Sequence, residues 1–105
     1  MQRFLAMTAV LTVLAVAPAH GQAIKTSGDL QKQCEAEQHG ACIDFLRQAA
    51  ARLAENDGLC LPEGYDPEQL REAFVAWAGE NTDTAGLSAN DGLLQALKDA
   101  FPCEE

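Results

Sequence analysis

Four cysteines are the residues of this chain whose type and spacing could do chemistry. They stand at positions 34, 42, 60 and 103. Structural zinc sites use closely spaced pairs such as C-x₂₋₄-C, whereas the closest two cysteines here, Cys34 and Cys42, are separated by seven residues. The sequence also contains no C-x-x-C pair of the kind that redox enzymes use. We therefore expect no metal site and no redox centre, and we expect the cysteines to form disulfides.

The remaining polar residues do not predict a catalytic centre. Of the two histidines, His20 lies close to the start of the chain and His39 falls in a predicted turn, where a solvated side chain is the simplest interpretation. No G-x-S-x-G motif accompanies them. Two carboxylate pairs are expected to be solvated surface charges in so acidic a chain: Glu35 with Glu37, and Glu68 with Glu72. We therefore expect neither an enzyme activity nor a cofactor.

The first 22 residues have the layout of a secretory signal peptide. Arg3 gives a positive start, Phe4 to Val16 is an almost wholly apolar run of 13 residues, and small residues follow it. The run is shorter than the ~20 residues that a membrane-spanning helix needs. We therefore expect residues 1–22 to be removed, with the cut between Ala19 and Ala23, and residues 23–105 to form one exported domain with no membrane insertion.

Charge and size narrow the class of partner. The chain has 16 Asp and Glu residues against 7 Lys and Arg, a formal net charge of −9. Such acidity disfavours nucleic acid and anionic membrane surfaces as partners and favours a basic protein. A domain this small buries only ~60% of the surface of its unfolded chain, so disulfides formed in an oxidising compartment are expected to support it.

Apolar residues recur at helical spacing in four segments, and no segment alternates as a strand does. The first predicted helix begins near Ser27, the second covers about 41–56, the third follows Asp66, and the fourth covers about 89–100. We expect an all-α domain of four helices, or five. The residues expected to face its core are Leu30, Cys34, Cys42, Phe45, Leu46, Ala49, Ala50, Leu53, Leu70, Ala73, Phe74, Trp77, Ala78, Leu93, Leu94, Leu97, Ala100 and Phe101.

Helix ends are marked by residues that cap helices. Asp66 is a good N-cap, Pro67 suits the first helical position, and Gln69 completes a capping box. Ser88 is a similar N-cap for the fourth helix, and Gly58 suits a left-handed C-cap for the second. The segments 59–65 and 81–87 are then the connecting loops on either side of the third helix.

Four cysteines allow three pairings, and helix geometry favours one. Cys34 near the end of the first helix and Cys42 near the start of the second should meet across a short turn. Cys60 lies beyond the far end of the second helix, roughly 25 Å from Cys42 at 1.5 Å per residue, whereas bridged Cα atoms must lie within ~7 Å. We predict Cys34–Cys42 with Cys60–Cys103. Two pairings stay open as alternatives: Cys34–Cys103 with Cys42–Cys60, and Cys34–Cys60 with Cys42–Cys103.

Several short groups of residues between positions 26 and 103 carry a likeness to a known family. They are Ser27-Gly28-Asp29-Leu30 before Cys34, Cys42 with Phe45-Leu46, Cys60-Leu61-Pro62, Asp66-Pro67-Glu68-Gln69-Leu70, and Ala96-Leu97 before Ala100-Phe101-Pro102-Cys103. Together they resemble the Rap/Tai family of type VI secretion immunity proteins. The likeness spans nearly the whole chain after the predicted signal peptide.

The resemblance implies a periplasmic protein that binds a toxic effector and blocks its active site. The effector class that it implies is a cell-wall hydrolase, namely a peptidoglycan amidase. An inhibitor needs a stable scaffold and a projecting segment rather than catalytic residues. Two predicted loops offer such segments, and the residues expected to bind the effector are Glu63, Gly64, Tyr65, Asp83, Thr84 and Leu87. For Tyr65, packing on the adjacent helix is an equal alternative.

The chain departs from the family at one place. The family has small glycines on both sides of an aromatic–aliphatic pair after the second cysteine, and here Asp44 and Gln48 flank Phe45-Leu46. Because glycine allows two helices to approach closely, we expect the packing of the second helix, or a homodimer formed through it, to differ from the family pattern.

Two other functions are compatible with the composition. A small acid-stress chaperone of the periplasm would expose apolar surface when its many carboxylates are neutralised. An accessory protein that only dimerises or assembles with others is the third class. Dye binding and suppression of aggregation at low pH would identify the chaperone, and a neighbouring toxin gene would favour the immunity protein.

Overall fold

The computed structural model of the chain describes residues 23–103, so the predicted signal peptide, residues 1–22, lies outside the part described. The described residues form an all-α domain, as the sequence predicts. Its elements are α1 (Ser27–Glu35), α2 (Gly40–Asp57), α3 (Pro67–Glu80), a short 3₁₀ turn η1 (Thr82–Thr84) and α4 (Ala89–Ala100).

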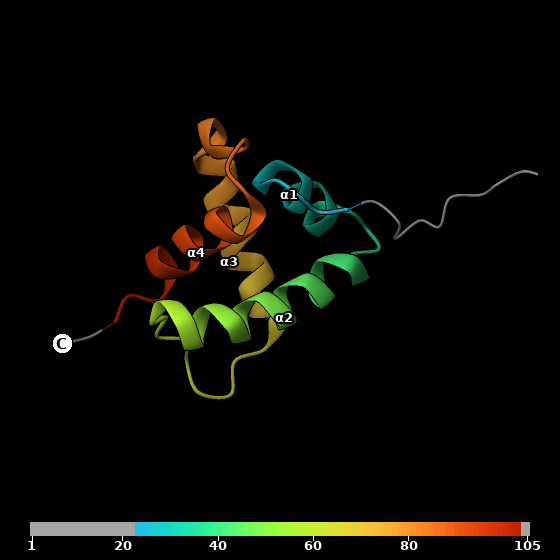
Figure 1. Cartoon of the computed structure of the whole chain (residues 1–105). Helices are drawn as coiled ribbons and strands as arrows, with labels where there is room; N and C mark the ends of the chain where they lie inside the picture. The colour runs from blue at the N-terminus through green and yellow to red at the C-terminus, as the bar shows by residue number, and fades with distance from the viewer. Residues whose placement is uncertain (1–22, 104–105) are drawn as a thin grey trace, which may run out of the picture.

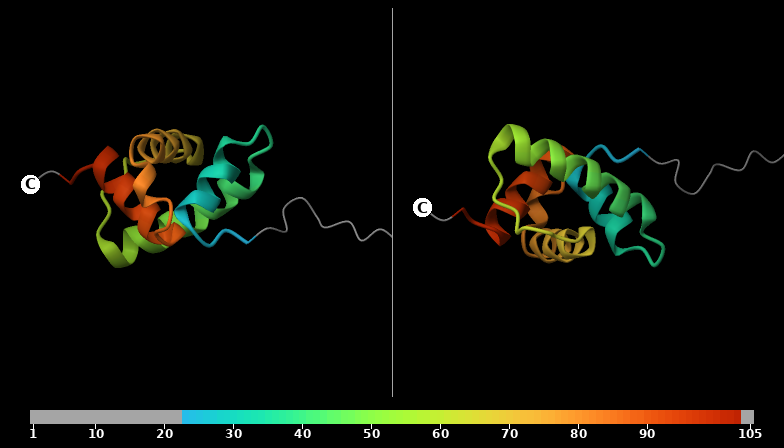
Figure 2. Two further views of the ribbon diagram at one scale, coloured as in Figure 1. Left: turned by 90° about the horizontal axis from the view of Figure 1, so that it is seen from above. Right: turned by 90° about the horizontal axis from the view of Figure 1, so that it is seen from below.

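Helices α1 and α3 each pack on all of the other α-helices. Figure 1 shows α2 running beneath α1, α3 and α4, and the chain from α2 to α3 forming a loop at the bottom of the view. In both views of Figure 2, α3 is seen nearly end-on and the other three helices lie on one side of it. Within residues 23–103, no other helix covers the opposite side of α3.

The capping residues explain where the helices begin and end. Thr26 and Asp29 form a capping box before α1, with 3.1 Å from the Asp29 amide to the Thr26 hydroxyl. Asp66 and Gln69 form the predicted capping box of α3, and the Ser88 hydroxyl accepts from an amide in the first turn of α4. Gly58 ends α2 with φ +67°, in the left-handed region that favours glycine.

The core lies between the four helices, each of which contributes buried apolar side chains. Phe74 is fully buried, and its ring centroid lies 6.3 Å from that of the buried Trp77. The prediction of inward-facing residues is confirmed for thirteen of the eighteen positions. It is too broad at the edges of the helical stripes, which are wider than the area that the neighbouring helices cover. Ala73, Phe45, Leu94 and Phe101 are only half-buried, and Ala100, at the last residue of α4, is exposed.

The predicted disulfides are the ones that the structure contains. Cys34–Cys42 joins the end of α1 to the start of α2 with 4.9 Å between the Cα atoms. Cys60–Cys103 joins the α2–α3 loop to the segment after α4 with 5.1 Å between the Cα atoms. Both alternative pairings are thereby excluded.

The lead-in to α1 pairs with the lead-in to α4, which sequence reasoning missed. The Ser27 amide donates to the Leu87 carbonyl at 2.7 Å, and the Gly28 amide donates to the Ala85 carbonyl at 2.9 Å. The Ala89 amide donates to the carbonyl of Lys25, also at 2.9 Å. Two amides of the first turn of α1, which have no partner inside the helix, thus bind the α3–α4 connection. We call residues 25–28 and 85–89 together the paired edge.

The paired edge requires α1 and α4 to approach closely. Ser27 is buried, with 1% of its surface exposed, and it faces Gly92 of α4. A Cβ atom added to Gly92 would lie 2.7 Å from the Ser27 Cβ atom, which is closer than packed carbon atoms can come. Glycine at position 92 is therefore what lets the two helices meet.

Replacing Gly92 by alanine is expected to destabilise the domain by about 1–3 kcal/mol, because the added methyl group forces α1 away from α4. The measurement is the free energy of unfolding in urea. Gly79→Ala is the matched control: nothing lies within 4 Å of its added Cβ, and alanine in a helix is favoured over glycine by up to about 1 kcal/mol. Equal effects of the two substitutions would contradict the close-approach account.

Candidate functional site

The two predicted binding segments lie at opposite ends of α3. One directly precedes the helix and the other directly follows it, and 14 helical residues separate their attachment points by roughly 20 Å. Figure 1 shows the 58–66 loop at the bottom of the view and the 81–88 connection at the top. The structure therefore does not bring the six predicted residues into one cluster.

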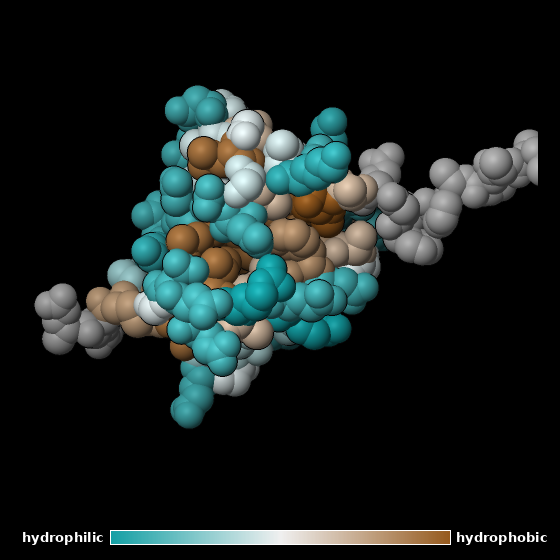
Figure 3. Space-filling model, viewed as in Figure 1, coloured by the Kyte–Doolittle hydropathy of each residue, from teal (hydrophilic) through white to brown (hydrophobic). Residues whose placement is uncertain are grey.

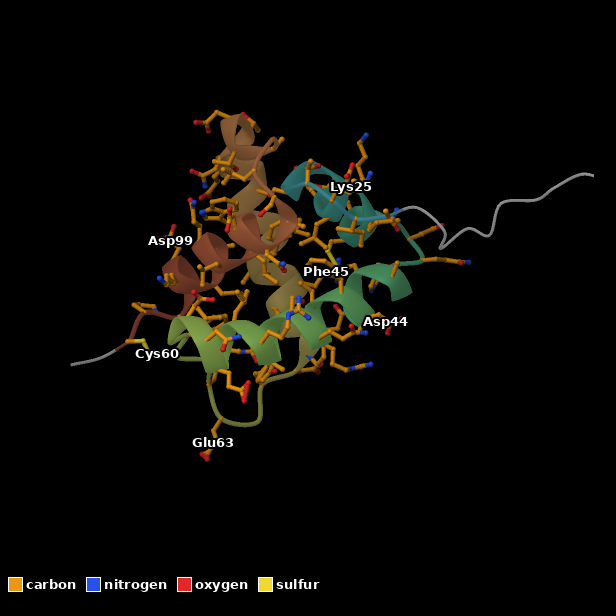
Figure 4. All side chains as sticks on the ribbon, viewed as in Figure 1. Lys25, Asp44, Phe45, Cys60, Glu63 and Asp99 are labelled. Atoms are coloured by element: carbon orange, nitrogen blue, oxygen red, sulfur yellow. A yellow bond between two sulfur atoms is a disulfide. The ribbon has the colours of Figure 1, made fainter. Side chains whose placement is uncertain are left out.

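The segment before α3 projects, but only in part. Figure 4 shows Glu63 at the tip of the loop, pointing away from the body of the molecule. Gly64 is exposed and has φ +67°, which places the turn there. Tyr65 is half-buried and packs against the core. This agrees with the alternative that Tyr65 packs within the domain, and it leaves only part of the side chain available to an effector. Of the three residues of this loop that were predicted to bind the effector, Glu63 and Gly64 are thus the exposed ones.

The segment after α3 is short, polar and held in place at both ends. Asp83 is exposed on η1, and the Thr84 hydroxyl donates to the Asn81 carbonyl at 2.6 Å. Leu87 is half-buried, and its carbonyl accepts the 2.7 Å bond from the paired edge. The Asn81 side chain donates to the Trp77 carbonyl at 2.8 Å, which fixes the end of α3. This connection is thus an ordered surface feature with exposed acidic and small residues.

Negative charge is concentrated in the half of the domain that carries these segments. Residues 53–103 contain ten Asp and Glu side chains against two basic ones, Arg71 and Lys98. Residues 23–52 contain four of each sign. The excess of negative charge therefore lies on the end of α2, the α2–α3 loop, α3, η1 and α4.

Arg71 is the centre of a polar network that sequence reasoning missed. Its Nη1 donates to the Cys34 carbonyl and its Nε donates to Glu68 Oε1, both at 2.9 Å. His39 Nε2 lies 2.9 Å from Glu68 Oε2, and His39 Nδ1 lies 3.1 Å from the Ala36 carbonyl oxygen. His39 and Glu68 thus pair with each other, which was not predicted, while 28% and 43% of their side-chain surfaces stay exposed to solvent. These two residues are 29 positions apart in the chain. No local sequence pattern therefore indicates that their side chains pair.

The network connects elements rather than creating a reactive group. Each of its three side chains already has a partner from another segment: the end of α1, the α1–α2 turn or the first turn of α3. The pKa of the Glu68 carboxyl is lowered, first by its bond to Arg71 and then by its bond to His39. The network holds these three elements together beside the Cys34–Cys42 bond.

An apolar area lies on the face opposite to the free side of α3. Figure 3 shows apolar atoms in the middle of this face, over the space between α2 and α4, with hydrophilic atoms around them. Phe45 points into this space from α2 (Figure 4), and it is half-buried against the core. We therefore treat this apolar area as an edge of the core.

Two negative findings apply to residues 23–103. No three His, Cys, Asp or Glu side chains in this part of the chain are grouped so that they could hold a metal ion. None of its helices combines the length and the apolar character that crossing a bilayer requires.

Comparison with known proteins identifies the family. The model of the Rap1a immunity proteins matches residues 26–103, which is most of the chain. This chain belongs to the Rap1a immunity protein family. Membership of the Rap1a family implies a protein that binds a partner effector as an inhibitor rather than as an enzyme. No curated protein and no solved structure matches the chain significantly.

The two residues that flank Phe45-Leu46 in α2 lie on a solvent-facing surface. Asp44 and Gln48 are both exposed, and the Asp44 carboxylate lies 3.7 Å from the Arg47 guanidinium. Figure 4 shows Asp44 pointing away from the rest of the molecule. Long polar and charged side chains thus cover this part of the α2 surface.

Acid is expected to weaken the Rap1a domain through two carboxyls. The pKa of Glu68 is lowered from 4.5 by Arg71 and His39, and that of Asp29 from 3.8 by the amides of Thr26 and Lys25. A lowered folded-state pKa gives stability that is present above the unfolded-state value and is lost as pH falls through the folded-state value. The free energy of unfolding should therefore fall on acidification from neutral pH to below these values.

Glu68→Gln should reduce the fall in the free energy of unfolding on acidification, because glutamine is not protonated over this pH range. Glu72→Gln makes the same charge change on the exposed side of α3 and should leave the loss as in the wild type. Urea unfolding at neutral and acid pH measures both. An unchanged acid loss in Glu68→Gln would contradict the role assigned to the network.

Proposed function

We propose that this protein is exported to the periplasm, where it binds and inhibits a type VI secretion effector that hydrolyses the cell wall, a peptidoglycan amidase. The observation that carries the proposal is the match of the Rap1a immunity family over residues 26–103, the whole folded domain. The layout of residues 1–22 supports export. The two disulfides support an oxidising compartment such as the periplasm.

Within this proposal, the α3–α4 connection is the segment that meets the effector. Its backbone is held by the paired edge and by the bonds at Asn81, so little conformational entropy is lost when it is bound. The 58–66 loop is the weaker candidate, because its aromatic residue, Tyr65, already packs on the core. A rigid segment that enters a catalytic cleft excludes the substrate without taking part in chemistry.

The charge distribution also favours the α3–α4 connection as the segment that binds the effector. Exposed carboxylates flank the connection at Glu80, Asp83 and Asp91. Complementary charge raises the rate of encounter with a basic partner and sets its orientation. The effector surface that meets the connection is therefore basic around the active-site cleft.

Co-expression tests the function directly. A cell-wall hydrolase encoded beside this chain, directed to the periplasm, should lyse cells, and co-export of the chain should restore growth. The oxidised protein, purified from the periplasm, should bind that hydrolase and abolish its activity on peptidoglycan at equimolar ratio. Binding without inhibition, or no protection, would contradict the proposal. Suppression of aggregation at low pH in place of binding would support the chaperone alternative.

A matched pair of charge reversals tests which segment binds. Asp83→Lys should weaken binding of the inhibited hydrolase by about tenfold or more, equivalent to ~1.4 kcal/mol, because it places a positive charge at a basic partner surface. Glu63→Lys makes the same change at the other end of α3 and should alter Kd by no more than about twofold, the effect of a distant charge. Isothermal titration calorimetry measures both Kd values. The reverse order of effects would assign binding to the 58–66 loop.

A further inference from the structure

The two disulfides differ in their access to solvent. Cys34 and Cys42 are both fully buried, with 0% of their surface exposed. Cys60 and Cys103 are both exposed. Thiol–disulfide exchange requires a thiolate to reach a sulfur atom along the S–S axis, so a reagent in solution can reach one bond of the folded protein and not the other.

The exposed bond joins two segments that lie outside the helices. Cys60 belongs to the α2–α3 loop, in which Leu59 is buried and Leu61 and Tyr65 are half-buried against the core. Cys103 follows α4 by three residues, and of the residues between them only Phe101 packs on the core. The Gly58 carbonyl oxygen lies 3.8 Å from Cys60 Sγ and 3.4 Å from Cys103 Sγ, within the loop that the bond closes.

We propose that Cys60–Cys103 is a thiol-exchange site, which a dithiol reductant opens while the Cys34–Cys42 bond stays closed. A thiolate of the reductant attacks one of the two sulfurs, forms a mixed disulfide and displaces the other cysteine as a thiolate. The second thiol of the reductant then displaces the first cysteine. The protein gains two thiols, Cys60 and Cys103, and the reductant leaves as its own disulfide, so two electrons and two protons pass to the protein.

The helices do not depend on this bond for their boundaries or for their packing. Helix α3 begins with its own capping box at Asp66, and α4 ends at Ala100, before the bridged residue. The large buried side chains of α3 and α4 belong to the core cluster that the four helices share: Leu70, Phe74, Trp77, Leu93 and Leu97. Opening therefore frees the exposed part of the 58–66 loop and the segment after α4, while the four helices and the paired edge stay in place.

Limited reduction of the oxidised protein tests the site. The protein is treated with dithiothreitol under native conditions, free thiols are alkylated, and the labelled peptides are quantified by mass spectrometry. Because the buried bond reacts only through an opened core, Cys60 and Cys103 should be labelled faster than Cys34 and Cys42, on the order of a hundredfold or more. Equal labelling rates for all four cysteines would overturn the proposal.

Two readouts establish what opening does. Helical circular dichroism of the form reduced at Cys60 and Cys103 should match that of the oxidised form, and amide exchange should accelerate in residues 58–66 but not in α3. The double variant Cys60→Ala/Cys103→Ala, which is permanently open, should reproduce both results. Loss of the helical signal on selective reduction, or unchanged exchange in the loop, would overturn the claim that the bond holds this loop alone. None of these readouts depends on an effector.

Discussion

The close approach of α1 to α4 is the constraint on which the rest of the structure depends. This approach requires glycine at position 92, opposite the buried Ser27. It allows residues 25–28 to pair with residues 85–89. The amides that α1 cannot satisfy internally are thereby satisfied by the α3–α4 connection. This one contact thus positions the start of α1 against the start of α4, and it orders the surface segment between α3 and α4.

The two disulfides and the Arg71 network secure the other parts of the domain. Cys34–Cys42 and the contacts of Arg71 hold the end of α1, the turn and the start of α3 together. Cys60–Cys103 ties down the loop and the tail at the opposite end of α2. The two disulfides thus have different tasks. The buried Cys34–Cys42 bond holds helices together, and the exposed Cys60–Cys103 bond holds a peripheral loop.

Much of this fold could be predicted because its signals are local. Asp66, Gln69, Ser88 and Gly58 mark helix ends within a few residues, and the cysteine pairing follows from helix lengths. The family likeness predicted the Rap1a membership that the comparison shows. The paired edge, the Gly92 contact and the His39–Glu68 pair could not be predicted, because each joins residues far apart in the chain. For the same reason the sequence could not show that the six candidate binding residues divide between opposite ends of α3.

The most direct test is amide hydrogen exchange of the oxidised protein, alone and in complex with the cell-wall hydrolase proposed as its effector. If the α3–α4 connection meets the effector, the complex slows exchange in residues 81–88 and in the adjoining first turn of α4, while residues 58–66 exchange as they do in the free protein. Protection confined to residues 58–66, or to the exposed face of α2 around Asp44, would contradict the assignment of the α3–α4 connection as the inhibitory segment.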